Sequence, residues 1–249
     1  MNTYVFLGPT LSLNEAKSCL DAFYCGPVQQ GDIVRALDRR AEAIGIIDGF
    51  FEVVPSVWHK EILLALSRGV YVCGAGSMGA LRAAELAPYG MVGIGTVFEW
   101  YRDGVIEEDD EVVVRHLNAE AGYKPASEAM VNIRQFLNEA AADGVISPAV
   151  TNYLTAVAKR LPYWERSYRS VLASARQELG SYEGEEALAR RVAEQRPSIK
   201  QRDAIALLTH LASGRLAEPV GQSTFELQYT VFLESLLAEA RKCDTASTR

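Results

Sequence analysis

The sequence predicts an α/β fold with a mostly parallel sheet flanked by helices in the N-terminal half, followed by an all-helical C-terminal region. Up to about residue 100, short apolar runs typical of buried strands alternate with helical segments. Beyond His116 the chain consists of long Ala-, Leu-, Glu- and Arg-rich segments with helical spacing. We therefore expect an α/β core domain over residues 1–120 and a helical region over 121–249, packed on or beside it.

Composition excludes several classes of protein. The 249 residues include 49% apolar residues, 25 basic and 32 acidic side chains, and no long basic block, so nucleic acid is not an expected partner. The N-terminus lacks the features of a signal peptide, and no apolar run is long enough to span a membrane. We expect a cytoplasmic protein without membrane association. The four cysteines and three histidines are scattered, so neither a metal nor a cofactor is expected.

The N-terminal elements follow from local signals. Residues 4–7 form an apolar run that predicts the first strand. Ser12 and Glu15 have the spacing of a capping box, which predicts a helix over 16–23. A brief second strand is expected at 23–25.

The same pattern then repeats. Asp32 is expected to cap a helix over 33–40, and the continuous apolar run at 43–47 predicts a strand buried on both faces. Pro55 suits the first turn of a helix that continues over 57–66.

The stretch over residues 69–85 is the centre of the predicted domain. Residues 70–73 favour a strand, and the run from Ala80 favours a helix that ends near 88–90. Ser77 lies at the tip of the small-residue turn between them. Such a turn, with the unpaired first amides of a helix, can bind an anion or hold a nucleophile beside oxyanion donors.

The second half contains mainly helical signals. Residues 112–114 could form one edge strand, because three valines follow an acidic run. Helices are expected at about 127–143, 147–161, 164–179, 183–194, 198–211 and 224–242.

Two alternatives to a catalytic Ser77 stay open. Residues 74–79 match G-x-G-x-x-G, the phosphate-binding pattern of nucleotide sites. However, the ribose-binding acid would fall near Glu99 inside an expected helix, and the pattern usually follows a first strand. Ser77 could also simply cap the next helix, which pattern alone favours.

The ends of the parallel strands predict a common cleft. Residues 8–10, Asp48 and Ser77 each follow an apolar run, and the connection over 52–60 lies between the last two. Lys60 lies beside an apolar stripe, where loss of solvation favours a neutral base. The alternative is an ammonium paired with Glu61, Glu52 or Asp48. The roles of His59, Arg82 and Glu85 are equally open, because an i,i+3 ion pair would explain Arg82 and Glu85 without any function.

Several short segments of the sequence resemble the TfuA-like family. They are IGIIDGFFE at 44–52, VPSVWHKEIL at 54–63, GAGSMGALRAAEL at 74–86, Gly90-Met91 and DDEV at 109–112. FLGP at 6–9 and Gly31-Asp32 agree with its N-terminal part. The resemblance covers roughly residues 4–135 and is loose beyond.

The resemblance implies a sulfur-delivery partner of YcaO enzymes in peptide backbone thioamidation. It would hydrolyse the C-terminal thiocarboxylate of a ThiS-like carrier, with Ser77 and Lys60 as catalytic residues. Partners would be a YcaO-type enzyme, a ThiS-like carrier and, as a further option, the peptide substrate. Substrate-binding residues would be Gly8, Pro9, Thr10, Asp48, Glu52, His59, Gly76, Met78, Gly79, Arg82 and Glu85. Amides near Met78 and Gly79, and those of residues 8–10, would stabilise the oxyanion.

Two other functions are kept beside this hydrolase. A non-catalytic adaptor would dock YcaO and its peptide substrate, with Ser77 serving only as a helix cap. A nucleotide-binding protein would use Gly74–Gly79 for phosphate.

Overall fold

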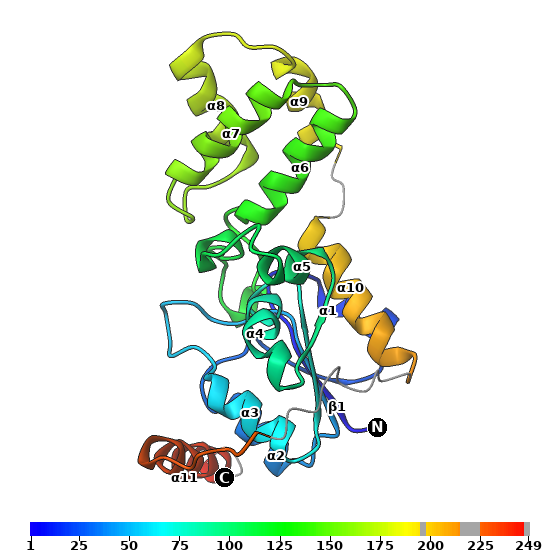
Figure 1. The fold of residues 1–249 in the computed structure, drawn as a ribbon, viewed down its shortest axis with the longest axis vertical. Helices are drawn as coiled ribbons and strands as arrows, with labels where there is room; N and C mark the ends of the chain where they lie inside the picture. Colours follow the sequence, from blue (N-terminus) through cyan, green and yellow to red (C-terminus); the bar gives the residue numbers. More distant parts are fainter. Residues whose placement is uncertain (195–197, 215–224, 247–249) are drawn as a thin grey trace. The chain divides into compact units, whose positions relative to one another are not determined.

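A computed structural model describes residues 1–194, 198–214 and 225–246 (Figure 1). Contacts divide the chain into two units, of which the first combines residues 1–106 with 201–249 and the second comprises 107–200. Residues 201–249 thus group with the α/β unit, whereas the sequence placed them in the helical region. The two units are described separately below.

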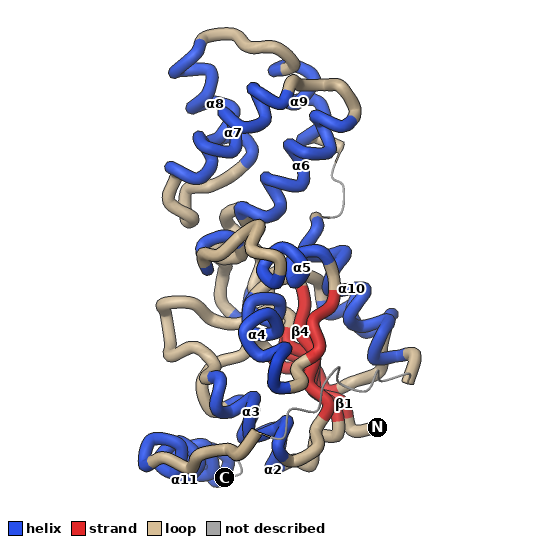
Figure 2. Tube along the Cα trace, viewed as in Figure 1, coloured by secondary structure: helices blue, strands red, loops and turns tan. Residues whose placement is uncertain are grey.

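The first unit contains a five-stranded sheet in the order β2-β1-β3-β4-β5, with every neighbouring pair parallel. Its strands are red in Figure 2. The strands are β1 (Thr3–Phe6), β2 (Phe23–Cys25), β3 (Ala43–Ile46), β4 (Tyr71–Ala75) and β5 (Val92–Ile94). This order is that of a doubly wound sheet, in which ligands bind beyond the carboxyl ends of the strands. The predicted fold class is confirmed, although β5 was not expected.

The helices of this unit are largely those that the sequence predicts. They are α1 (Leu13–Cys19), α2 (Asp32–Asp38), α3 (His59–Ser67), α4 (Met78–Leu86), α5 (Thr96–Arg102), α10 (Ile199–Ala212) and α11 (Val231–Ala246). The capping box of Ser12 and Glu15 is confirmed at the start of α1. The last helix begins later than expected, and the predicted start at Thr224 lies outside the described residues.

Two helix starts differ from the sequence prediction. Asp32 does not cap α2, because Gly31 occupies the N-cap position with φ of +89° and Asp32 lies in the first turn. Its carboxylate instead accepts a hydrogen bond from the amide of Gln29 at 2.8 Å. The next helix, α3, begins at His59, so Pro55 lies before the helix and not in its first turn, which instead contains Lys60.

Helices cover both faces of the sheet. On one face, α1 and α10 pack against alternate strand residues, including Val5 and Cys73. On the other face lies α4, which contacts β3, β4 and β5 (Figure 2). Glycines on both faces permit close approach. A side chain at Gly45 would lie 3.0 Å from both Leu207 and Leu211 of α10.

The closest approach is between α4 and the sheet. A Cβ atom on Gly79 would lie 1.7 Å from the carbonyl oxygen of Ile46, and one on Gly74 would lie 2.0 Å from the carbonyl oxygen of Gly79. The amide of Gly79 also donates a 3.2 Å hydrogen bond to the carbonyl of Ile47. Two glycines therefore fix the start of α4 directly on the backbone of β3 and β4.

Helix α5 is capped by a residue distant in the sequence. The carboxylate of Asp203, on α10, accepts hydrogen bonds from the amides of Thr96 at 3.0 Å and Val97 at 2.8 Å. Burial raises the pKa of Asp203 to about 6, although these two hydrogen bonds oppose the shift. The cap position itself is Gly95, where any side chain would overlap Asp203.

The second unit is helical, with α6 (Met130–Ala142), α7 (Pro148–Arg160), α8 (Tyr168–Leu179) and α9 (Glu185–Val192) around one apolar core. Ser147 caps α7, as its position before Pro148 suggests. These helices confirm the helical pattern predicted from residue 127 onward.

The expected edge strand at 112–114 is wrong. The chain forms a 3₁₀ turn over Asp109–Glu111 and no strand follows in this described segment. Ion pairs explain the difference. Glu111 binds Arg134 through two 2.8 Å hydrogen bonds, and Lys159 contacts both Asp110 and Glu111. Arg166, which is 1% exposed, adds a 3.0 Å contact to Asp110 and completes the network.

We predict that Gly79→Ala severely destabilises the first unit, because the new methyl group would overlap the carbonyl of Ile46. We expect a loss of at least about 3 kcal/mol in unfolding free energy, measured by urea denaturation. The matched control is Gly104→Ala, where φ is +68° but nothing lies within 4 Å of the added methyl group. It should lose only about 1 to 2 kcal/mol. Equal losses in the two variants would contradict the overlap.

Candidate functional site

Ser77 lies at the tip of a tight turn between β4 and α4. Gly76 has φ of +68°, and the amide of Ser77 donates a 2.7 Å hydrogen bond back to the carbonyl of Ala75. Ser77 is only 4% exposed and occupies the N-cap position of α4, yet its side chain makes no capping hydrogen bond. The interpretation of Ser77 as a helix cap is therefore wrong. A serine on a sharp strand-to-helix turn is an arrangement that nucleophilic hydrolases use.

The first amides of α4 are largely used within the fold. The amide of Gly79 bonds to the carbonyl of Ile47, while those of Ala80 and Leu81 bond to the carbonyl of Ser77. The expected oxyanion donor at Gly79 is therefore already committed. Met78 keeps an amide without an assigned acceptor among the described residues, although its side chain is fully buried and packs against Gly49.

Asp48 organises the loop that follows β1. Its carboxylate is 1% exposed and accepts hydrogen bonds from the amides of Gly8 at 2.8 Å and Thr10 at 3.0 Å. A third bond, of 2.6 Å, comes from the hydroxyl of Thr10. The expected convergence of Gly8, Thr10 and Asp48 is thus present, but this carboxylate serves to hold the loop. The amides of Gly8 and Thr10 are not open to an oxyanion.

Lys60 is half-buried in the first turn of α3. Its amine donates a 3.2 Å hydrogen bond to the hydroxyl of Thr230, just before α11. No hydrogen bond joins Lys60 to Ser77, and no ion pair of Lys60 occurs among the described residues. The alternative of an ammonium paired with Asp48, Glu52 or Glu61 is therefore not found. Assignment of Lys60 as the base of Ser77 stays a prediction.

Glu61 is a buried residue beside Lys60 whose role the sequence did not reveal. Its carboxylate is 0% exposed and accepts hydrogen bonds from the amides of Gly31 at 2.7 Å and Trp58 at 3.2 Å. Burial raises the pKa of Glu61 to about 7, against the opposing effect of these hydrogen bonds. Position 58 is a tryptophan, which cannot accept a capping hydrogen bond, so no capping-box pattern marked Glu61 in the sequence.

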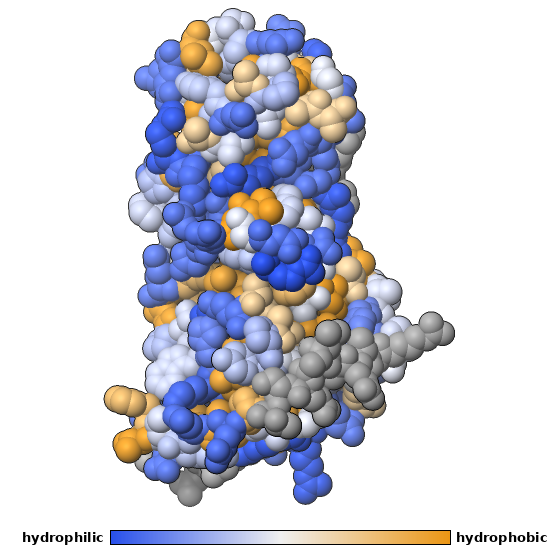
Figure 3. Space-filling view, viewed as in Figure 1, coloured by the Kyte–Doolittle hydropathy of each residue, from blue (hydrophilic) through white to orange (hydrophobic). Residues whose placement is uncertain are grey.

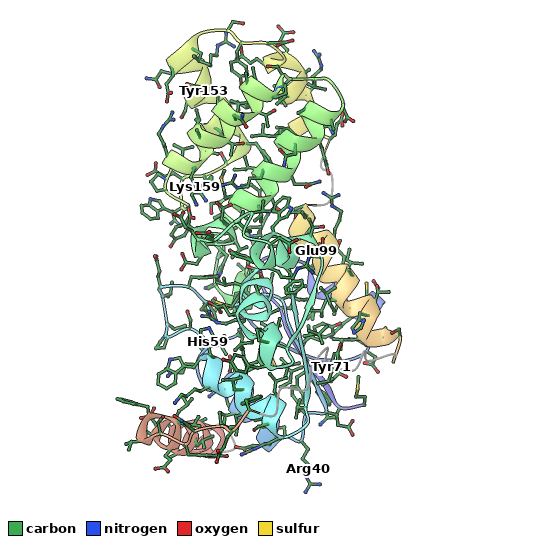
Figure 4. The ribbon with its side chains drawn as sticks, viewed as in Figure 1. Arg40, His59, Tyr71, Glu99, Tyr153 and Lys159 are labelled. Carbon is green, nitrogen blue, oxygen red and sulfur yellow. The ribbon has the colours of Figure 1, made fainter. Side chains whose placement is uncertain are left out.

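His59, Arg82 and Glu85 form one polar group that links α3 to α4. One oxygen of Glu85 lies 2.8 Å from His59 Nε2 and 2.7 Å from an Arg82 nitrogen (His59 is labelled at the start of α3 in Figure 4). Burial alone would raise the pKa of Glu85, but hydrogen bonds from His59 and Arg82 outweigh it and lower the pKa. Among the described residues, the buried Nε of Arg82 has no hydrogen-bond partner. Arg82 therefore keeps a donor that could bind an anion.

Pro9 and Glu52 are the remaining predicted substrate-binding residues. Pro9 is half-buried in the loop that Asp48 holds, and Glu52 is exposed in the connection before α3, with φ of +61°. Within the described part of the chain, no group of three or more His, Cys, Asp or Glu side chains is placed to hold a metal ion. No helix there is both long and apolar enough to cross a membrane.

Comparison with known proteins gives one family match. Residues 48–167 match the model of the TfuA-like protein family. The comparison with curated proteins gives no match. The matched segment contains Asp48, Lys60, Ser77 and the His59–Arg82–Glu85 group, and in the second unit it extends to Ser167.

We predict that Glu61 makes stability fall as the pH rises. Its pKa of about 7 in the folded state exceeds its ordinary value of 4.5, so the folded chain retains this proton more tightly. The stabilisation is complete below pH 4.5 and is lost as the pH rises through 7. Relative to Glu61→Gln, the wild type should lose about 2 to 3 kcal/mol of unfolding free energy between pH 5 and pH 8.

The measurement is urea unfolding of both proteins at each pH. Glu99→Gln, at an exposed position of α5, is the matched control and should follow the wild type. A constant difference between wild type and Glu61→Gln across this range would contradict the prediction.

Proposed function

Because the chain belongs to the TfuA-like family, which is associated with YcaO-dependent thioamidation, we propose that it delivers sulfur for that reaction. In this proposal it hydrolyses the C-terminal thiocarboxylate of a ThiS-like carrier protein and releases sulfide. Ser77 is the nucleophile and Lys60 is the base. A YcaO-type enzyme and the carrier are its partners, the peptide substrate is a further candidate, and the reaction takes place in the cytoplasm.

One observation carries the proposal. Ser77 is a buried serine at the tip of a strand–turn–helix, and its side chain does not serve as the cap of α4. A serine held in this way is suited to attack an extended chain end that enters over a turn of small residues. Lys60 supports the assignment, because it lies on a helix that contacts α4 and has no carboxylate partner among the described residues.

The proposed reaction has two steps. Neutral Lys60 takes the proton of Ser77 as Oγ forms a bond to the thiocarboxyl carbon. The Lys60 ammonium then returns this proton to the sulfur as the C–S bond breaks, so that hydrosulfide leaves and Lys60 is neutral again. Water attacks the resulting acyl-serine ester with Lys60 again as base, which restores Ser77 and frees the carrier carboxylate. The amide of Met78 is the proposed oxyanion donor, because those of Gly79, Ala80 and Leu81 already have acceptors. The Nε of Arg82, which has no partner in the described structure, is a candidate to bind the negative charge of the incoming thiocarboxylate.

An exposed apolar surface favours the adaptor as a second candidate function. Tyr229, Val231 and Phe232 are 58%, 76% and 74% exposed around the start of α11. Apolar side chains are visible over this helix in Figure 3. Such a surface suits docking of a protein partner. Nucleotide binding at Gly74–Gly79 has less support, because the amides of Gly79, Ala80 and Leu81 already have acceptors.

We predict that Ser77→Ala and Lys60→Ala each lower the rate of sulfide release from thiocarboxylated carrier by at least about a hundredfold. The measurement follows sulfide with purified carrier and purified protein. Ser67→Ala and Lys17→Ala, which change the same residue types elsewhere in the first unit, should retain the wild-type rate. Wild-type rates in both Ser77→Ala and Lys60→Ala, with thioamidation also intact, would exclude the hydrolase and favour the adaptor.

A further inference from the structure

The hydroxyl of Thr230 joins the C-terminal helix to the lysine of the proposed site. Thr230 precedes α11 and lies 170 residues after Lys60, whose amine donates to Thr230 Oγ1 at 3.2 Å. The same oxygen accepts a longer hydrogen bond, of 3.4 Å, from the amide of Leu233. Thr230 therefore serves two donors, the side chain of Lys60 and the first turn of α11.

Of the three carboxylates considered as ion-pair partners of Lys60, Asp48 and Glu61 are held by other groups, and Glu52 forms no ion pair with Lys60 in the described part of the chain. Asp48 binds the loop after β1, and Glu61 binds the amides of Gly31 and Trp58. Glu85 binds His59 and Arg82. Thr230 is consequently the polar side chain that holds the Lys60 amine in the described structure. A hydroxyl differs from a carboxylate in that it orients an amine without strongly favouring its charged form.

The attachment of α11 fixes the position of Thr230. Leu233, Leu236 and Ala240 are buried along one side of α11, and this helix contacts α2. The Cβ of Ala240 lies 3.6 Å from the place that a side chain on Gly31 would occupy. Gly31 is in turn held by Glu61 on α3. The start of α11 is thus fixed relative to the first turn of α3.

From this geometry we infer that Thr230 is a positioning residue for Lys60, so that the C-terminal helix completes the proposed site. The inference rests on the proposed function, in which Lys60 is the base. The hydroxyl of Thr230 accepts one hydrogen of the amine and limits its rotation, which leaves the nitrogen lone pair to receive the proton of Ser77. Thr230 lies outside the segment that matches the family model.

Two substitutions of Thr230 separate this role from helix capping. Thr230→Asp keeps a strong N-cap for α11 but places a carboxylate against Lys60, which stabilises the ammonium. We expect kcat for sulfide release at pH 7.5 to fall at least about tenfold, with KM within about twofold and an unchanged melting temperature. Thr230→Ser keeps the hydroxyl and should retain kcat within about twofold. A wild-type kcat in Thr230→Asp would overturn the inference, because a residue that only caps α11 predicts that result.

A second measurement does not depend on activity. Acetylation of individual lysines by a limiting acylating reagent, followed by mass spectrometry, reports how readily each amine reacts. We expect Thr230→Asp to slow acetylation of Lys60 about tenfold and to leave the exposed Lys17 unchanged. An unchanged Lys60 rate would show that Thr230 does not act on this lysine. If Lys60→Ala is fully active while Lys60 acetylation still responds to Thr230→Asp, the proposed function fails and the contact with Thr230 stands.

Discussion

The start of α4 packs directly on the sheet backbone, and this contact determines the geometry of the α/β unit around Ser77. Gly74 and Gly79 have no side chains, so the start of α4 approaches β3 and β4 closely enough for the amide of Gly79 to bond to Ile47. That approach determines where the turn over Gly76 ends and places Ser77 at its tip. The glycines that resemble a phosphate-binding motif therefore act mainly in packing, and they consume one of the amides that a phosphate would need.

Three buried carboxylates of this unit have the same structural role. Asp48 holds the loop after β1, Glu61 holds the loop before α2, and Asp203 caps α5. Each accepts backbone amides that would otherwise lack partners, which offsets part of the cost of burying the charge. Beside Lys60, the carboxylate of Glu61 is committed to backbone amides, and the hydroxyl of Thr230 holds the Lys60 amine.

The sequence predicted features that depend on neighbouring residues. The apolar run of β3, the capping box before α1 and the turn at Ser77 all have local signals. It missed β5, because three residues interrupted by Gly93 give almost no strand pattern. Residues 112–114 have strand propensity, but ion pairs of Asp110 and Glu111 decide their conformation.

The candidate site shows the same division between local and distant information. Convergence of Gly8, Thr10 and Asp48 followed from parallel strands ending at one edge. The contacts of Thr230 with Lys60 and of Asp203 with Val97 join residues 170 and 106 positions apart, and neither has a local pattern. The grouping of residues 201–249 with the sheet also has a consequence during synthesis. The ribosome makes about a hundred residues of the second unit before it makes α10. At about 5 to 20 residues per second, the sheet face around Val5 and Cys73 therefore stays uncovered for roughly 5 to 20 s. The nascent α/β unit therefore exposes an apolar face of its sheet for as long as the ribosome needs to finish the inserted helices.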